Sequence, residues 1–194
     1  ITGANIKQFS HRVSLHACST QRGFVEGRQF VLNIPDLDAH SRAQANYNHF
    51  PHESDLALWD FLAAFPSVRH QWVLAVFRAY GFPSGFCSFL EALLHHNFAM
   101  FSSKGFQFFL YLILAGIVQG CPSAGLCFAV AADPFFRLLD SLQYKLSSKG
   151  ISKALKRKPP KLDSFHCIFR GCADDIGAAL GSFKLLKLIK PIFD

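Results

Sequence analysis

The sequence predicts an α+β fold. Short apolar runs typical of strands occur at residues 56–60 and on both sides of the acidic pair Asp174-Asp175. Apolar residues follow helical spacing instead after Ser67, after Ser84 and over 126–146. The chain has 194 residues, of which 51% are apolar and only 17% charged, so it can bury a core and is not a disordered polypeptide.

The first quarter of the chain carries the weakest signals. Residues 1–20 are polar without a periodic pattern, and we expect an irregular lead-in. Residues 21–28 place two glycines around an aromatic, which predicts a tight backbone segment leading into a short helix over 30–34. Residues 36–54 are rich in Asp, His, Asn and Gln and are interpreted as a surface connection.

The next stretch predicts one strand followed by two helices. Leu56–Asp60 has the pattern of a buried strand that ends in a carboxylate. Pro66 and Ser67 predict the start of a helix with Ser67 as its N-cap, and Gly81 predicts its end. A second helix is expected to begin at Ser84.

The second half of the chain predicts three further elements, two before the acidic pair and one after it. A hairpin is predicted over 98–111, turning at Ser103–Gly105. A long helix is predicted over 126–146, and Pro134 within it should kink or break it. A last, shorter helix is expected from Phe183.

The charge of the chain is uneven. The net charge is +7, and seven Lys or Arg with no acid lie between residues 145 and 161. Lys184, Lys187 and Lys190 form a second basic group. This asymmetry predicts a polyanionic partner such as nucleic acid, anionic lipid or an acidic protein. For the run 145–161 alone, a solvated loop is an equally good explanation.

Two residue types stand out in the composition. The 22 Phe provide more aromatic surface than one core of this size needs, so some should face a partner, a missing part of the protein or lipid. The six Cys form no C-x-x-C pair and mostly lie in apolar runs. We interpret them as reduced thiols of a protein in an intracellular, reducing compartment.

The acidic residues are the candidate site. Asp174 and Asp175 fall where the 165–180 hairpin turns, and adjacent carboxylates need solvation, a basic partner or a divalent cation. An exposed turn is the simplest explanation for such a pair. Asp60, however, ends another strand. Three carboxylates from two neighbouring strand ends can hold two divalent ions, and Mg²⁺ suits such a site.

At these positions the chain resembles reverse transcriptases of non-LTR (LINE-type) retrotransposons. The resemblance rests on four segments in the family's order: Gln21–Asn33, Asp60–Ser67, Gly116–Pro122 and Cys172–Asp175. It implies an RNA-directed DNA polymerase fold, with a palm of small antiparallel sheet and helices packed on one face, plus partial fingers. The Asp60 strand should lie beside the acidic hairpin. The implied domains are partial fingers over 1–55 and a palm over 56–194 with a basic insertion at 145–162.

The resemblance also implies roles for individual residues. Asp60, Asp174 and Asp175 would be catalytic and would bind two Mg²⁺ ions. Phe65 would lie under the sugar of the incoming nucleotide and exclude a 2′-hydroxyl. The Gln119-Gly120 turn would pack against template and nucleotide.

Arg28, in the fingers segment, would by the same resemblance contact template or triphosphate. The partners would be an RNA template, a DNA primer and a deoxynucleoside triphosphate. The compartment would be the nucleus or cytoplasm.

The sequence departs from the family in three places. Cys172 replaces the usual Tyr or Phe before Ala-Asp-Asp, and Ser123–Gly125 replaces the usual Leu-Ser-Pro. The family's next palm motif and thumb do not follow before Asp194, so we expect a truncated fingers and palm fragment. The alternative function is therefore a non-catalytic, retroelement-derived structural subunit among protein neighbours in a large complex. A third interpretation, contact with lipid, rests on the Phe-rich region 98–118.

Overall fold

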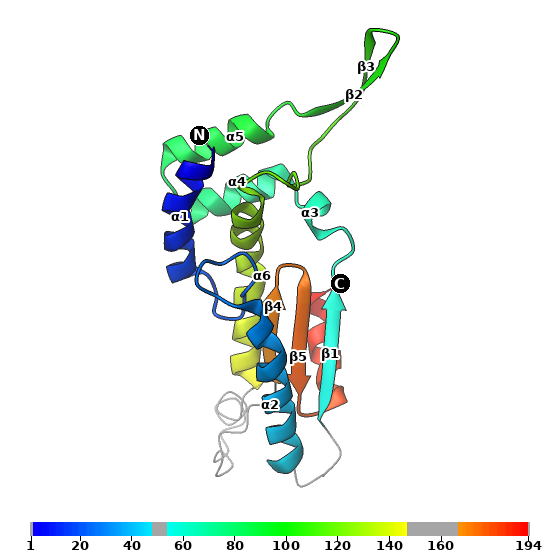
Figure 1. Ribbon diagram of the computed structural model, residues 1–194. Coiled ribbons are helices and arrows are strands. Elements are labelled where there is room, and N and C mark those ends of the chain that lie inside the picture. Colours follow the sequence, from blue (N-terminus) through cyan, green and yellow to red (C-terminus); the bar gives the residue numbers. More distant parts are fainter. Residues whose placement is uncertain (1, 48–53, 147–166, 194) are drawn as a thin grey trace.

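A computed structural model describes residues 2–47, 54–146 and 167–193, and Figure 1 shows how their elements are arranged. The helices and strands follow one another as α1 (Thr2–His16), η1 (Phe30–Leu32), α2 (Asn33–Tyr47), β1 (Asp55–Asp60), α3 (Ala64–Ser67), α4 (His70–Ala79), α5 (Ser84–Leu94), β2 (Phe98–Ser103), β3 (Phe106–Leu112), α6 (Ala124–Leu146), β4 (Cys167–Cys172), β5 (Asp175–Leu180), η2 (Phe183–Leu185), α8 (Leu186–Ile189) and η3 (Lys190–Ile192).

The larger sheet contains β1, β5 and β4 in that order, and all its pairings are antiparallel. β4 and β5 form the predicted hairpin, and β1 lies against β5 as predicted. The register runs from Asp55 opposite Leu180 to Asp60 opposite Asp175. The turn of the hairpin and the C-terminal end of β1 therefore lie at the same end of the sheet (Figure 1).

Alternation along the strands decides which side chains share a face of this sheet. Ala57 and Trp59 of β1 lie on the same face as Ala178 and Ile176, their partners on β5. This face packs against α6, and Trp59 stacks on Phe193 with ring centroids 4.7 Å apart. The sequence predicted a buried strand here, but β1 is only half buried, because Leu56 and Leu58 alternate onto the opposite face, where both are exposed.

Helices lie on both faces of the sheet. On one face α6 comes so close that a Cβ built on Gly171 would lie 2.1 Å from the ring of Phe136. On the other face α2 crosses β4 and β5, and Leu37 occupies the space left by the missing side chain of Gly177. Helices were predicted on one face only: α6 confirms that face, and α2 covers the other face as a layer that was not predicted. Because α2 belongs to the predicted fingers yet packs on the palm sheet, the domain boundary near residue 55 stays a prediction.

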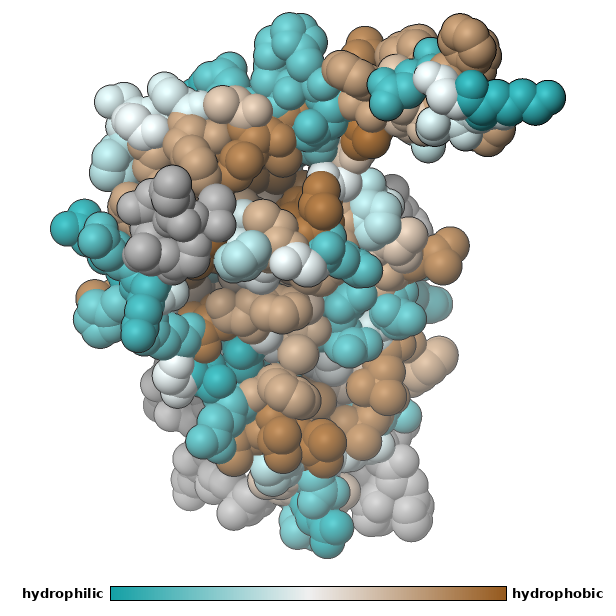
Figure 2. Space-filling model, turned by 45° about the horizontal axis from the view of Figure 1, so that its top comes forward, coloured by the Kyte–Doolittle hydropathy of each residue, from teal (hydrophilic) through white to brown (hydrophobic). Residues whose placement is uncertain are grey.

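A second cluster of buried side chains surrounds α4, α5 and the first half of α6, with Phe77, Leu90 and Val130 near its centre. From this part of the molecule the hairpin of β2 and β3 projects outwards (Figure 1). All seven residues of β3 are exposed, and Figure 2 shows apolar side chains along the hairpin. The hairpin predicted over 98–111 is confirmed, and its two strands pack mainly on each other.

Two segments predicted to be irregular are helical. α1 replaces the expected lead-in, because Ile6, Phe9 and Val13 recur at helical spacing and pack on the second cluster. α2 replaces the expected surface connection. In its described part, α2 buries one apolar side chain, that of Leu37, and one residue is too weak a pattern to predict a helix from the sequence. The negative charge of Asp36 in the first turn stabilises the start of the helix.

The predicted N-cap at Ser67 is wrong. α4 begins three residues later, because residues 68–70 pair as extended chain with 114–116: His70 N donates to Leu114 O at 3.1 Å and Gly116 N to Val68 O at 2.9 Å. The Ser67 hydroxyl instead donates to the Ala63 carbonyl across the short helix α3.

α6 continues through Pro134, so the predicted break does not occur. Buried residues before and after Pro134 hold the helix in place. Proline has no N–H to donate to the preceding turn, and in that turn the Trp72 indole donates to the Ala131 carbonyl at 2.9 Å. The predicted starts at Ser84 and Phe183 are confirmed. The basic run 145–161 lies outside the described residues apart from its first two positions. In the described part of the chain, none of the helices has the length and hydrophobicity of a bilayer-spanning segment.

Packing of α6 on the sheet gives a stability prediction. Gly171→Ala should lower the free energy of unfolding by about 1–3 kcal/mol, because the new methyl group collides with the buried ring of Phe136. Gly85→Ala is the matched control: it lies in α5 with open space around it and should change stability by less than about 1 kcal/mol. Chemical denaturation measures both, and equal effects would contradict the packing described.

Candidate active site

Asp60 and Asp175 face each other at the end of the sheet. Their Cα atoms are register partners in β1 and β5, so both side chains leave the same face, the one on which α2 packs further along the strands, and both are exposed. Side chains directly opposite in antiparallel strands have Cβ atoms about 4.5–5.5 Å apart. Asp174, half buried, precedes Asp175 in the turn itself. The structure thus brings two of the three predicted carboxylates together across a strand pair and places the third beside them in the chain.

These carboxylates have no basic partner in the part of the chain that the structure describes. No hydrogen bond or ion pair reaches the carboxyl groups of Asp60, Asp174 or Asp175 from residues 2–47, 54–146 or 167–193. Over the same ranges no three or more His, Cys, Asp or Glu side chains are grouped closely enough to enclose a metal ion. The site therefore consists of two exposed carboxylates, Asp60 and Asp175, with Asp174 next to them in the chain, and does not form a closed ligand cage.

The turn that carries the acids is strained and clamped. Ala173 adopts a left-handed backbone with φ of 57°, which costs energy for any residue with a side chain. The fully buried Gln21 secures it: its Oε1 accepts hydrogen bonds from Ala173 N at 3.2 Å and from Gly23 N at 3.0 Å. Gly23 has no room for a Cβ, which would lie 2.4 Å from Ala173 N. The conformation of residues 21–23 therefore fixes the acidic turn.

The backbone of the same segment continues the sheet. Gln21 forms an isolated parallel bridge with Gly171 on the outer edge of β4. Arg22 N donates to Gly171 O at 2.9 Å, and Gly171 N donates to Thr20 O at 2.8 Å. The tight backbone segment predicted at residues 21–28 is thus held at its start by backbone hydrogen bonds to β4.

Cys172 stands where the resembled family has an aromatic residue. It is the register partner of Asp175 and so lies on the same face as the acidic pair. Burial raises the pKa of its thiol, and the negative charges of Asp175 and Asp174 raise it further. At neutral pH Cys172 is therefore an uncharged thiol next to the carboxylates.

Two arginines that the sequence interpretation missed lie near this face. Arg22 and Arg170 both bind Asp36 Oδ2, at 2.5 Å and 2.9 Å. Burial alone would raise the pKa of Asp36, but the hydrogen bonds from Arg170 and Arg22 hold it below its ordinary value. Two guanidinium groups sharing one carboxylate leave a local positive charge. The position of Arg170 could have been predicted from the sequence, because Arg170 lies two residues before Cys172 in a predicted strand and therefore on the same face.

Phe65 lies in α3 and is held between two other rings. It stacks on Phe128 with centroids 4.2 Å apart and meets the edge of Phe24 at 5.6 Å. Its carbonyl accepts a hydrogen bond from Ile117 N at 2.9 Å, and Gly116 packs against Pro66. These contacts attach the Asp60–Ser67 segment to the Gly116–Pro122 loop. The position of Phe65 under the sugar of a nucleotide stays a prediction.

Gln119 and Gly120 form an exposed turn, as predicted. Gly120 has a φ of 88°, and nothing lies within 4 Å of the position a Cβ would take. The turn is therefore accessible to a ligand, and its contact with template and nucleotide stays a prediction.

Arg28 has a structural role in the described chain. Its guanidinium donates to four backbone carbonyls at the end of α1 and just after it, those of Ser14, Ala17, Cys18 and Gln21, at 2.5–3.0 Å. It thereby caps α1 and supports the segment that clamps the acidic turn. Contact with template or triphosphate stays a prediction and would require the side chain to leave these carbonyls.

Comparison with solved structures places this site in a known fold. The chain is similar to the apo telomerase from Candida tropicalis truncated from its C-terminal domain, a polymerase related to reverse transcriptases, with a TM-score of 0.61 and 9% sequence identity. The match covers 98% of this chain and 36% of the telomerase chain. No protein-family model matches the sequence, and no curated protein sequence matches it. At this identity the likeness shows the fold alone, and that fold is α+β.

The facing carboxylates give a prediction about cations. Without divalent ions, Asp60→Asn should raise the free energy of unfolding by about 0.5 kcal/mol, because it removes a like-charge pair across two strands. Mg²⁺ should stabilise the unaltered protein more than this variant, since an ion bound only by the folded chain adds to its stability. Denaturation in EDTA and in Mg²⁺ measures both effects.

The control for this prediction is Asp38→Asn, which removes an exposed carboxylate paired with Arg42 on α2. Its response to Mg²⁺ should equal that of the unaltered chain. Equal stabilisation of all three proteins by Mg²⁺ would contradict a site at the acidic turn.

Proposed function

We propose that this chain carries the nucleotidyl-transfer site of an RNA-directed DNA polymerase of the LINE-type reverse transcriptase kind. The observation that carries the proposal is the open pair Asp60 and Asp175, with Asp174 beside it, on a reverse-transcriptase-like fold. The partners would be an RNA template, a DNA primer and deoxynucleoside triphosphates.

The donor set fits Mg²⁺. Carboxylate oxygens are hard ligands, and Mg²⁺ binds through one or two of them while keeping water and phosphate oxygens, so an open pair suits it better than a closed cage. Asp60 and Asp175 would hold the ions from opposite strands and Asp174 from the turn. When bound, Mg²⁺ supplies activation of the primer 3′-hydroxyl and charge stabilisation of the leaving pyrophosphate.

The chain's own residues contribute position and charge. Gln21 fixes the turn, so Asp174 and Asp175 need little reorganisation to receive a ligand. Arg22 and Arg170 provide the positive charge that a triphosphate or nucleic-acid backbone would meet on this side of the molecule, and Arg22 has a buried guanidinium nitrogen without a hydrogen-bond partner in the described chain.

Primer extension on an RNA template with Mg²⁺ tests the proposal. The unaltered chain should extend the primer, and Asp174→Ala should reduce extension at least a hundredfold, because it removes a proposed metal ligand. Asp38→Ala, an exposed carboxylate on α2, should extend normally. No extension by either the unaltered chain or Asp38→Ala, or equal extension by all three, would overturn the polymerase proposal.

The exposed hairpin favours a second function, that of a structural subunit among protein neighbours. Eleven large apolar residues between positions 98 and 114 are 37–72% exposed, although β2 and β3 form only a two-stranded sheet. If each presents half of the 150–250 Å² that a large side chain can bury, the hairpin offers on the order of 1,000 Å², about one side of a standard protein interface.

A protein fits this surface better than lipid or nucleic acid. The two outer strand edges have unpaired backbone groups, which hydrocarbon cannot satisfy. Lys104 is the one Lys or Arg between residues 98 and 114, whereas single-stranded nucleic acid needs a basic groove.

Light scattering over a concentration series tests this second function. Phe106 and Phe108 share one face of β3, and Leu110 lies at the bulge of the same strand; changing all three to Ser should abolish concentration-dependent association. Phe183→Ser removes an equally exposed ring elsewhere and should leave association unchanged. Association that survives the hairpin changes would exclude the hairpin as the contact.

A further inference from the structure

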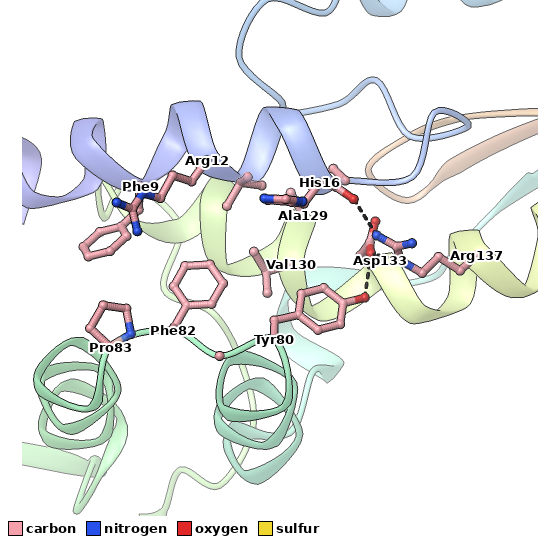
Figure 3. A pocket seen from close by; sticks show the side chains of 13 residues that line it. Phe9, Arg12, His16, Tyr80, Phe82, Pro83, Ala129, Val130, Asp133 and Arg137 are labelled. Carbon is pink, nitrogen blue, oxygen red and sulfur yellow. Dashed lines mark hydrogen bonds and ion pairs between the residues drawn. The ribbon is translucent and has the colours of Figure 1, made fainter.

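A cavity of about 340 Å³ lies between α1, α6 and the connection from α4 to α5, apart from the acidic turn (Figure 3). Its volume is at the lower end of the range of 300–1,000 Å³ that small-molecule sites in proteins occupy. Neither proposed function uses it.

One half of the cavity is apolar. The rings of Phe9 and Phe82 lie with centroids 5.9 Å apart, and the buried Val130 of α6 faces the space beside them (Figure 3). Such a wall binds a flat hydrocarbon body by burial and ring contact.

The other half is polar, but its negative charge is already neutralised. Asp133, 1% exposed, accepts hydrogen bonds at 2.6 Å from Cys18 N, from the Tyr80 hydroxyl and from Arg137 Nε. Burial and the bond to Asp133 raise the pKa of Tyr80, which therefore stays a neutral donor. The bond to Asp133 raises the pKa of Arg137, which stays charged. This end of the cavity therefore does not repel an anion.

The α1 wall adds positive charge that has no counter-ion. Arg12 is exposed and lines the cavity, and its side chain has neither a hydrogen bond nor an ion pair with any described residue. His16 lies one turn further along the same wall (Figure 3). An unpaired guanidinium next to an apolar recess is a site for a carboxylate or phosphate on an apolar body.

We propose that this cavity binds a small organic anion with a flat apolar body. The body lies against Phe9, Phe82 and Val130, and the anionic group binds Arg12. Asp133 and Arg137 shape the far end and are not ligands for the anion.

An NMR titration with naphthalene-1-carboxylate, compared with the neutral 1-naphthalenemethanol, tests the proposal on the full chain. The methyl signals of Val13 and Val130, both buried residues lining the cavity, should shift and saturate with the acid. Arg12→Gln should weaken binding of the acid about tenfold, because a hydrogen bond to a charged group is lost, and should leave binding of the alcohol unchanged. Lys7→Gln removes an exposed charge on the same helix outside the cavity and should bind the acid normally.

Three results would overturn the proposal. The first is equal affinity of Arg12→Gln and the unaltered chain for the acid. The second is equal loss of affinity in Lys7→Gln, which would indicate attraction by net charge alone. The third is a set of shifts confined to the exposed hairpin residues, with the signals of Val13 and Val130 unmoved.

Discussion

The register of β1 against β5 is the constraint on which the candidate site depends. A slip of one residue would turn every side chain of β1 to the opposite face, and the apolar side chains of Ala57 and Trp59 must face α6 and the C-terminal turns. The same alternation then forces Asp60 onto the opposite face, where it is exposed directly across from Asp175. Burial on one face thus brings together two like charges on the other, an arrangement that folding alone does not favour and that a bound cation would stabilise.

A second constraint fixes the turn between these strands. Ala173 keeps its left-handed backbone because Gln21, buried beside it, accepts its N–H, and because Gly23 allows the two chains to approach. Arg28 in turn holds the carbonyl of Gln21 and the end of α1. The segment that the sequence interpretation assigned to template contact is therefore, in the described structure, a support for the acidic turn. Strain of this kind at an open acidic site agrees with a functional rather than an incidental turn.

The sequence predicted those elements whose signals are local and strong. The alternation around Asp174-Asp175 and at Asp60 was sufficient to place the acidic residues on strand ends and in a turn. Two kinds of feature were out of reach. In α1 the helical spacing rests on three apolar residues alone, and α2 buries too few apolar side chains to show a period. The pairing of Asp36 with Arg22 and Arg170 joins residues 14 and 134 positions apart. The late start of α4 likewise depends on a bridge to residue 115 that no local pattern shows.

Whether the acidic turn binds divalent cations is the central claim, and paramagnetic broadening by Mn²⁺ measures it most directly. At substoichiometric Mn²⁺, the amide signals of Asp60, Asp174 and Asp175 should broaden first, well before those of exposed carboxylates engaged in ion pairs such as Glu91. Broadening spread equally over the exposed acids, or beginning elsewhere while the Asp60 and Asp175 signals stay sharp, would contradict the account.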